Sequence, residues 1–489
     1  MSHLSRRQFL EDSMFAAAAA AAAGTALSGN ARQALADRPA RTKSANEKLS
    51  VACVGVKGRG ASHIGAYAGR EDTEITYICD ADEAVGQGRA EGVAGSQGIK
   101  PKFVRDMREV FDDPSVDIVC TATPNHWHAL CSIWAMQAGK DVYVEKPVSH
   151  NVSEGRRMVG AARRHERICQ TGTQSRSNPG MREIMAAIHA GEIGEVKLSR
   201  GLCYKRRPSI GAPGEYQPPA EVDYTLWSGP AGVLPLTRPQ FHYDWHWQWA
   251  YGNGDLGNQG IHQMDLARWA LGVDTVGDHV LSYGGRLGYE DAGETANTQV
   301  NIHRFGDKTL VFEVRGLPTE QYMGAGVGVI VYGSTGYAVI PTYNGGSLFD
   351  LNGTMLRSFG GGEDSFHFQN FLDAVRSRNH AELNAEILDG HLSSALCHLG
   401  NISYRLGGAI PAAEVTSRLN GSSEAQETFE RFSQHVAANG ADRATTNIQF
   451  GQPLAIDPAT ESFVDNADAD RHLTREYVAP FVVPKAGEV

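Results

Sequence analysis

The amino-acid sequence predicts an α/β fold with two domains: a parallel sheet comes first, and an α+β domain with a large, mostly antiparallel, open sheet follows. From Leu49, short apolar runs alternate with helix-like stretches, which is typical of a parallel sheet covered by helices on both faces. After about residue 175, longer runs alternate polar and apolar residues, as strands do in a sheet with one buried face. The 489 residues suffice for two separate cores.

The first domain is predicted to span residues 49–175. Helix-like stretches, such as 126–139 and 153–165, separate most of its expected strands. These strands are the apolar runs at 49–55, 74–80, 117–124, 141–147 and 167–174.

The second domain is predicted to span residues 176–416. It opens with a helix at 179–190 that ends at Gly191, where a glycine suits a left-handed cap. Helices at about 258–271, 364–378 and 384–406 are expected to cover one face of its sheet. The other face stays open, which favours a homo-oligomer, a dimer or tetramer. The expected strands are 195–204, 297–305, 308–316 and 328–333.

The two ends of the chain differ in composition from the two predicted domains. Residues 1–36 carry Arg6-Arg7, eight alanines at 16–23 and a small-residue cleavage site at 34–36, which predict a twin-arginine signal peptide and a periplasmic protein. The alanine run is too weakly apolar for stable membrane insertion. Residues 37–48 read as a linker, and 417–489 as a C-terminal extension that is partly ordered.

The net charge and the cysteine content limit the classes of binding partner and of covalent cross-link that we expect. The net charge of −11 and the absence of a basic block argue against nucleic acid or an anionic membrane as the main partner. The seven cysteines are scattered and mostly embedded in strand-like runs, so they are expected to be core residues rather than a disulfide framework.

A glycine-rich turn follows the first predicted strand. The segment GVKGRG at 55–60 places Gly55 and Gly60 as a dinucleotide-binding motif does, with the helix N-terminus facing a pyrophosphate. Lys57 occupies the place of the middle glycine, and Gly58 beside it is expected to supply the flexibility. Gly55, Gly58, Arg59 and Gly60 are therefore predicted cofactor-binding residues; the alternative is a plain strand–turn–helix.

An aspartate ends the second predicted strand. Asp80 lies 25 residues after Gly55, where a carboxylate accepts hydrogen bonds from a ribose diol and repels a 2′-phosphate. The cofactor is therefore predicted to be NAD, with NADP disfavoured. Asp82 is the alternative, because either aspartate could be a turn residue.

Two further loops lie at the same predicted sheet edge. Lys146, next to Glu145, points to the ligand crevice, where partial burial lowers its pKa and lets it relay a proton. The alternative is a surface lysine before a turn proline. The predicted cofactor-binding residues of these loops are Thr123, Pro124, Asn125, His128, Glu145 and Lys146.

Taken in order, the glycine turn at 55–60, the Thr-Pro-Asn-x-x-His at 123–128 and the Glu-Lys-Pro at 145–147 resemble the Gfo/Idh/MocA family of glucose–fructose oxidoreductases and inositol dehydrogenases. The resemblance runs from about residue 49 to 406. It implies a Rossmann domain that binds a dinucleotide, and a lysine, here Lys146, near both nicotinamide and substrate. In that family the proline of Glu-Lys-Pro often follows a cis bond.

The family's second-domain signature is matched at 252–265 with one departure: Asn258 stands where the family usually has aspartate. On one helix Asn258, His262 and Asp265 would share a face. His262 is predicted to take the hydroxyl proton, with Asn258 orienting its imidazole. Asp265 is a predicted substrate ligand. The alternative for His262 is a buried interfacial histidine.

Residues 241–249, FHYDWHWQW, are dense in aromatic side chains that suit the C–H faces of sugars. Trp245 and His246 are therefore predicted substrate contacts, as is Arg176 after the last strand of the first domain. Two alternatives stay open: a buried aromatic cluster, or a strand on which His242, Asp244 and His246 line up as metal ligands. No metal is predicted.

Three functions remain compatible with the sequence. The first is an NAD-dependent oxidoreductase acting on a sugar, polyol or sugar derivative, with a Lys146/His262 proton relay and a cofactor that is retained. The second is a redox-neutral, NAD-dependent glycosidase or epimerase, which export favours because free NAD is scarce outside the cytosol. The third is a non-catalytic sugar-binding protein, which the retention of Lys146 and His262 argues against.

Overall fold

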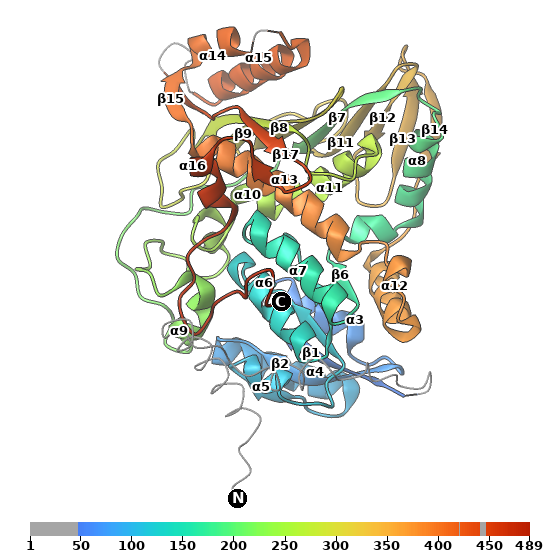
Figure 1. Ribbon diagram of the computed structural model, residues 1–489, viewed down its shortest axis with the longest axis vertical. Helices are drawn as coiled ribbons and strands as arrows, with labels where there is room; N and C mark the ends of the chain where they lie inside the picture. The colour runs from blue at the N-terminus through green and yellow to red at the C-terminus, as the bar shows by residue number, and fades with distance from the viewer. Residues whose placement is uncertain (1–46, 420, 441–445) are drawn as a thin grey trace, which may run out of the picture.

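The computed structural model describes residues 47–419, 421–440 and 446–489. The predicted signal peptide and most of the predicted linker lie outside the described residues. Two sheets organise the described chain, one in the lower and one in the upper half of Figure 1, with helix α13 (Ile387–Arg405) between them. This arrangement confirms the predicted fold class.

The first sheet has six strands in the order β3-β2-β1-β4-β5-β6, all paired in parallel. This is the strand order of a Rossmann domain. β3 is short and was not predicted. The strands are β1 (Leu49–Val54), β2 (Thr73–Cys79), β3 (Lys102–Val104), β4 (Ile118–Thr121), β5 (Asp141–Val144) and β6 (Cys169–Thr171).

Helices cover both faces of this sheet. Alternate strand residues face opposite sides, so Val119 packs with α6 and α7 while Cys120 packs with α3 and α4. The helices are α3 (Gly60–Tyr67), α4 (Glu83–Gln97), α5 (Arg108–Phe111), α6 (Asn125–Gln137) and α7 (Val152–Arg164).

The second sheet is larger and antiparallel except where β10 pairs with β7. Helices α8 (Pro179–His189), α11 (Gly260–Leu271) and α13 cover its inner face, and Gly191 follows α8 with a positive φ as predicted. Its strands, in spatial order, are β14 (Met355–Phe359), β13 (Gly346–Asp350), β12 (Gly336–Ile340), β11 (Val327–Gly333), β7 (Val196–Cys203), β10 (Lys308–Arg315), β9 (Thr298–Phe305), β8 (His279–Gly285), β16 (Asn447–Phe450) and β15 (Gly408–Pro411), with β17 (Leu454–Asp457) beside β8 and β18 (Ser462–Phe463) beside β17.

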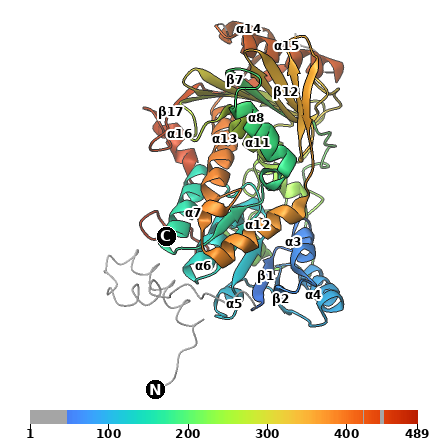
Figure 2. The same ribbon diagram turned by 90° about the vertical axis from the view of Figure 1, so that its right-hand side faces the viewer.

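Helix α12 (Asp364–Ser377) does not cover this sheet, contrary to the prediction. Its Phe368, Phe371 and Leu372 pack against the first sheet, in one cluster with Val51 and Tyr143. Figure 2 shows α12 beside the first domain. An apolar face on a helix predicts that the helix is buried. The surface against which it packs depends on residues that are distant in sequence.

The segment after residue 417 contributes far more regular structure than the partly ordered tail that the sequence suggested. Helices α14 (Ala412–Arg418) and α15 (Ser423–Ala438) pack on the outer face of the second sheet, where Phe429 and Phe432 meet Tyr283. That face is therefore partly covered by the chain itself, which corrects the expectation of an open face. The homo-oligomer stays a prediction.

The last residues cross back to the first domain, where Phe481 and Val489 join the core around Trp127. On the way the chain forms the short helices α16 (Ala467–Asp470) and η5 (Arg471–Leu473). All seven cysteines are buried and unpaired, as the sequence predicted.

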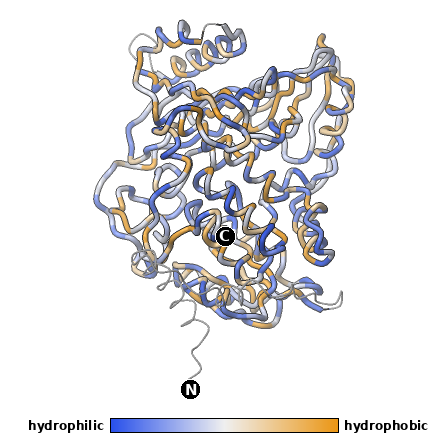
Figure 3. Tube along the Cα trace, viewed as in Figure 1, coloured by the Kyte–Doolittle hydropathy of each residue, from blue (hydrophilic) through white to orange (hydrophobic). Residues whose placement is uncertain are grey.

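None of the described helices is long and apolar enough to cross a membrane. Hydrophobic and hydrophilic residues interleave along the tube in Figure 3, as expected for helices and strands with one buried face.

Candidate active site

The carboxyl ends of the parallel strands gather most of the predicted cofactor residues at one edge of the first sheet. Gly55 follows β1, Asp80 follows β2, Thr123 follows β4 and Glu145 follows β5. In open α/β sheets this edge is where ligands bind. Parallel pairing therefore brings together four loops that are up to 90 residues apart in sequence.

The glycine turn is closely fitted to the neighbouring strand. Gly55 has a φ of +74°, and a Cβ there would lie 2.6 Å from the backbone nitrogen of Thr123. A Cβ on Gly60 would lie 2.0 Å from the carbonyl oxygen of Gly55. Gly58 differs: nothing lies within 4 Å of a Cβ placed there, and its φ is outside the left-handed region. The backbone of Gly58 is therefore accessible to a ligand, but Gly58 does not adopt a conformation that requires glycine.

The start of α3 suits an anionic group. No side chain caps this helix, and its first turn has no acidic residue. The Arg59 guanidinium, at the turn, donates through Nε to Glu145 at 2.9 Å and through Nη1 to Asp364 at 2.8 Å, while its Nη2 has no partner. A helix start without a side-chain cap or an acidic residue, next to an unpartnered guanidinium nitrogen, fits the pyrophosphate of a dinucleotide.

Asp80 borders this turn directly. Its Oδ2 accepts from the backbone nitrogen of Val56 at 2.8 Å, and its Oδ1 accepts from that of Asp82 at 3.0 Å. Burial raises the pKa of Asp80 to about 6. Asp82, the alternative, instead caps α4 through Val85 and contacts His242 at 2.9 Å. Asp80 stays the predicted ribose ligand.

Glu145 is buried at the end of β5, with its carboxylate between Arg59 and His63. Burial opposes ionisation, but the contacts with His63 and Arg59 outweigh it and hold the pKa of Glu145 well below its usual range. An ionised Glu145 fixes Arg59 at the turn.

The loop at 123–128 is tied to both neighbours. Pro124 precedes α6, and Asn125 donates to the Oδ1 of Asn253 in the second domain at 2.9 Å. The two ring nitrogens of His128 face the carbonyl oxygens of Thr123 and Pro147 at 2.7 and 2.6 Å. His128 therefore holds two loops of the sheet edge together. The Lys146–Pro147 bond is cis, as the resemblance implied.

Lys146 reaches the second domain, where its Nζ donates to the carbonyl oxygen of Asn258 at 2.9 Å. His262 lies one turn further along the chain and is only 7% exposed, with its Nδ1 unpartnered. Burial and then the charge of Lys146 lower the pKa of His262 well below its usual range, and burial lowers the pKa of Lys146. A neutral imidazole thus lies near the lysine.

The helix predicted at 258–271 is divided. α10 (Gly254–Asn258) ends before α11 begins at Gly260, so Asn258 and His262 do not share one helix. The expected contact from the Asn258 side chain to the imidazole is also absent among the hydrogen bonds of the described residues; Asn258 contributes its backbone oxygen to Lys146. The close packing of Gly260 against the Phe312 ring accompanies this break.

Sequence reasoning missed the other groups around His262. Tyr343 lies with its ring 5.1 Å from the imidazole, its hydroxyl accepts from Gln259, and Gln259 accepts from Lys205 at 2.9 Å. Gln259 lies within the signature matched at 252–265. Tyr343 comes from a loop about 80 residues away, and no sequence motif marks it as a neighbour of His262.

The aromatic segment at 241–249 is not a strand. Asp244–Trp247 form the short helix η3, and His242 turns toward Asp82 while His246 contacts the carbonyl of Tyr243. The metal alternative therefore fails, and no group of three possible metal ligands occurs among the described residues. Phe241 and Trp247 are buried, whereas Trp245 and His246 are partly exposed and stack at 3.6 Å.

His246 contacts residues of its own segment, namely Tyr243, Trp245 and Trp247. Burial and, more weakly, the charge of Lys146 lower the pKa of His246 to about 3. Tyr243 has a φ of +70°. The backbone N–H of Asp244 donates to the carbonyl oxygen of His242, which makes a γ-turn centred on Tyr243, a strained conformation. Trp245 and His246 remain the predicted substrate contacts.

Arg176 and Asp265 pair with each other. The Nε of Arg176 donates to Asp265 at 2.7 Å, and the other carboxylate oxygen accepts from Ser393 at 2.7 Å. Arg176 also lies 3.4 Å from Asp389 and 5.0 Å from the Trp269 ring. Both side chains are buried in this network of α11 and α13, so their substrate roles stay predictions.

Two family profiles match the chain. Residues 49–173 match the Gfo/Idh/MocA profile described as an oxidoreductase family with an NAD-binding Rossmann fold, and residues 213–294 match its C-terminal alpha/beta domain. These matches support the Gfo/Idh/MocA family and an oxidoreductase with NAD as cofactor.

Among curated proteins, an alpha-N-acetylgalactosaminidase of Shewanella oneidensis is 30% identical over 209 residues, which are 40% of this chain and 45% of that protein. The match thus spans less than half of the relative's length. A scyllo-inositol 2-dehydrogenase (NAD(+)) of Bacillus subtilis is 37% identical over 116 residues, 24% of this chain and 34% of that protein.

Among solved structures, a levoglucosan dehydrogenase in complex with NADH and levoglucosan has a TM-score of 0.56 at 18% identity, over 72% of this chain and 95% of that one. At this identity the likeness shows the fold alone.

Proposed function

We propose that this chain, an oxidoreductase of the Gfo/Idh/MocA family, transfers hydride between NAD and a carbon of a sugar, polyol or sugar derivative. The observation that carries the proposal is the position of Lys146: it leaves the ligand-binding edge of the Rossmann sheet and meets the second domain one turn before a neutral, buried His262.

The residues of the sheet edge suit the cofactor. Bound NAD supplies the hydride acceptor. Open backbone at Gly58, the start of α3 and the free Nη2 of Arg59 would hold its pyrophosphate, and Asp80 its ribose.

The proton follows a separate path. As hydride leaves the substrate carbon, the proton of its hydroxyl goes to an unprotonated ring nitrogen of His262, and the Lys146 ammonium stabilises the developing charge on the oxygen. The lowered pKa of His262 keeps its imidazole unprotonated at neutral pH, with a ring nitrogen available to the substrate proton. Trp245 and His246 would contact the sugar, as would Arg176 and Asp265.

The direct test uses the purified protein. Its absorbance reveals retained nucleotide, and candidate sugars and polyols are then added to it. Stable formation of NADH supports the proposal; an absence of nucleotide binding would contradict it.

A second candidate is a redox-neutral glycosidase, because the S. oneidensis relative carries the name of one. Here a glycoside would be cleaved with no net NADH formed. The same experiment separates the two functions. The oxidoreductase match sets aside the non-catalytic alternative.

Asp80→Ala should weaken NAD binding and relax discrimination against NADP, because the carboxylate that accepts from a ribose diol and repels a 2′-phosphate is gone. Dissociation constants of both nucleotides give the measurement. Asp82→Ala is the matched control, since Asp82 caps α4 instead. Tighter NADP than NAD binding by the unchanged protein would refute the assignment.

Asn258→Asp should raise the pKa values of Lys146 and His262, because a carboxylate beside their charged forms stabilises those forms. We expect the limbs of the pH profile of kcat/KM to move upward by about one unit. An unchanged profile would place residue 258 outside the relay.

We propose that the protein is exported by the twin-arginine route and acts in the periplasm. Replacing Arg6-Arg7 by Lys-Lys should then leave the uncleaved precursor in the cytoplasm, as fractionation and immunoblotting would show. Export of that variant at the normal rate would remove this support for a retained cofactor.

A further inference from the structure

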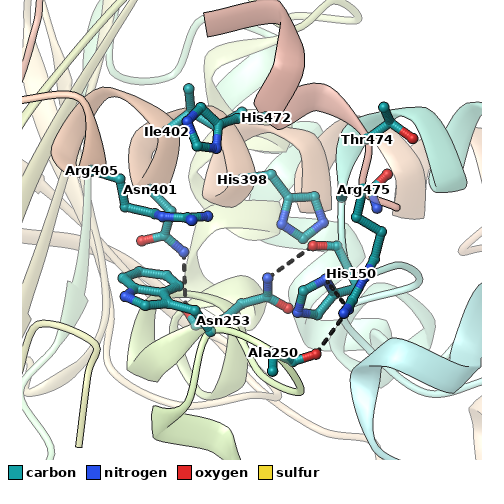
Figure 4. A pocket seen from close by; sticks show the side chains of 12 residues that line it. His150, Ala250, Asn253, His398, Asn401, Ile402, Arg405, His472, Thr474 and Arg475 are labelled. Atoms are coloured by element: carbon teal, nitrogen blue, oxygen red, sulfur yellow. Dashed lines mark hydrogen bonds between the residues drawn. The ribbon is translucent and has the colours of Figure 1, made fainter. Parts of the chain in front are cut away.

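A cavity of about 310 Å³, whose lining includes neither Lys146 nor His262, lies where the start of α7, the end of α13 and the C-terminal segment meet. Figure 4 shows it between Arg405 of α13 and Arg475 of the C-terminal segment. Its lining contains no aspartate or glutamate. A volume near 300 Å³ is at the lower end of small-molecule sites.

The hydrogen bonds and the ring contact of the two arginines go to neutral groups, and Arg475 also lies 3.4 Å from the Nδ1 of His150. Arg475 donates to the carbonyl oxygen of Ala250 at 2.8 Å, and Arg405 lies 5.0 Å from the Trp249 ring centre. Within the described part of the chain, neither forms an ion pair. Arg405 is exposed and Arg475 is half-buried, and two guanidinium groups without a salt bridge favour an anion between them.

Glu154 interacts electrostatically with Arg475 and Glu294 with Arg405, but both carboxylates also accept hydrogen bonds from other groups. Glu154 accepts from the backbone of His150, from Asn151 and from Tyr477 at 2.8 to 3.0 Å. Glu294 accepts from the backbone of Trp249 at 2.7 Å. Burial and then the charge of Arg475 lower the pKa of His150 well below its usual range, which marks a positive potential in the cavity.

Two histidines, His150 and His398, also line this cavity. His398 is 3% exposed, and its Nδ1 has no partner; the Nε2 of His150 is also unpartnered. Figure 4 shows both rings facing the cavity. Buried polar atoms left without a partner are costly, so a bound acceptor would satisfy them.

We propose that this cavity binds the oxyanion of a compact small molecule, a phosphate or carboxylate group, between Arg405 and Arg475. The site is separate from the proposed hydride-transfer site and would belong to an effector or to a remote group of a ligand. Imidazole N–H groups and arginine forks are the donors that such oxyanions accept.

The test is calorimetric titration of the folded protein saturated with NAD, using inorganic phosphate, glucose 6-phosphate and glucuronate in turn. We expect saturable binding of at least one probe, weakened at least about 10-fold by Arg405→Gln and by Arg475→Gln. Arg471→Gln is the matched control, because that neighbouring arginine is 76% exposed and outside the lining, and it should bind normally. The preferred probe identifies a free phosphate, a phosphorylated sugar or a carboxylate.

Three outcomes would overturn the proposal: no probe binds, both cavity variants bind normally, or Lys146→Met alone abolishes binding. If Arg475→Gln does not fold, the binding result for Arg405→Gln decides, because the Arg405 side chain packs over the Trp249 ring and forms no salt bridge among the described residues. No readout involves turnover, so failure here leaves the proposed hydride transfer untouched.

Discussion

Lys146→Met should lower kcat and kcat/KM for hydride transfer by about 10²–10³-fold, the usual scale for removing one group that stabilises a developing negative charge on oxygen. The variant removes the charge that would stabilise the substrate oxygen, while the glycine turn and Asp80 stay intact. NAD affinity should therefore change little. Steady-state kinetics and nucleotide titration on the same preparations measure the two effects.

Lys308→Met is the matched control. Its Nζ donates to the carbonyl oxygen of Leu271 at 2.8 Å, the same type of contact at the opposite end of α11. That variant should turn over normally. Unchanged turnover in Lys146→Met, or in His262→Ala, would contradict the proposed relay.

Glu313→Gln should destabilise the protein by about 3–5 kcal/mol, the range for breaking a buried ion pair. Glu313 is 1% exposed between β10 and α15, where it contacts Arg200 at 2.7 Å, Arg315 at 3.1 Å and Arg431. The amide would leave these arginines without their shared counter-charge. Urea unfolding and hydrogen exchange of α15 give the measurement.

The same residue sets a pH dependence. Burial opposes ionisation of Glu313, but Arg200 and Arg431 outweigh it and lower its pKa from 4.5 to about 2. A depressed pKa adds stability above about pH 4.5, and this contribution disappears as the pH falls toward 2. Glu313→Gln should therefore flatten the acid limb of the stability curve.

Glu195→Gln is the control for this pair of measurements, because Glu195 is exposed and paired only with Lys197. Its stability and acid limb should match those of the unchanged protein. Equal stability of Glu313→Gln would show that the arginine cluster is satisfied without the carboxylate.

Local patterns were enough for much of the first domain. Alternating strands and helices predicted five of its six strands, and the missing β3 has only three residues, too short for a periodic signal. The positions of Gly55, Asp80 and Lys146 at one sheet edge followed as well, because parallel strands place their carboxyl ends together.

Contacts between side chains from different elements were not predictable from such local patterns. The sequence placed His262 and Asn258 on one helix, but in the structure the helix is interrupted at Gln259, next to the close contact of Gly260 with Phe312 of β10, and the Asn258 carbonyl accepts from Lys146 of the other domain. Tyr343 beside His262 likewise comes from a loop distant in sequence.

The sequence by itself thus determined the two-sheet fold class, the glycine turn and the residues at the ends of the parallel strands. Periodicity and turn chemistry are local properties, and they act within a few residues. Only the tertiary structure decided that α12 covers the first sheet, that α15 covers the outer face of the second, and that the C-terminal segment encloses a cationic cavity. An apolar helix face specifies burial but no particular partner, so these choices depend on which distant surfaces fit together.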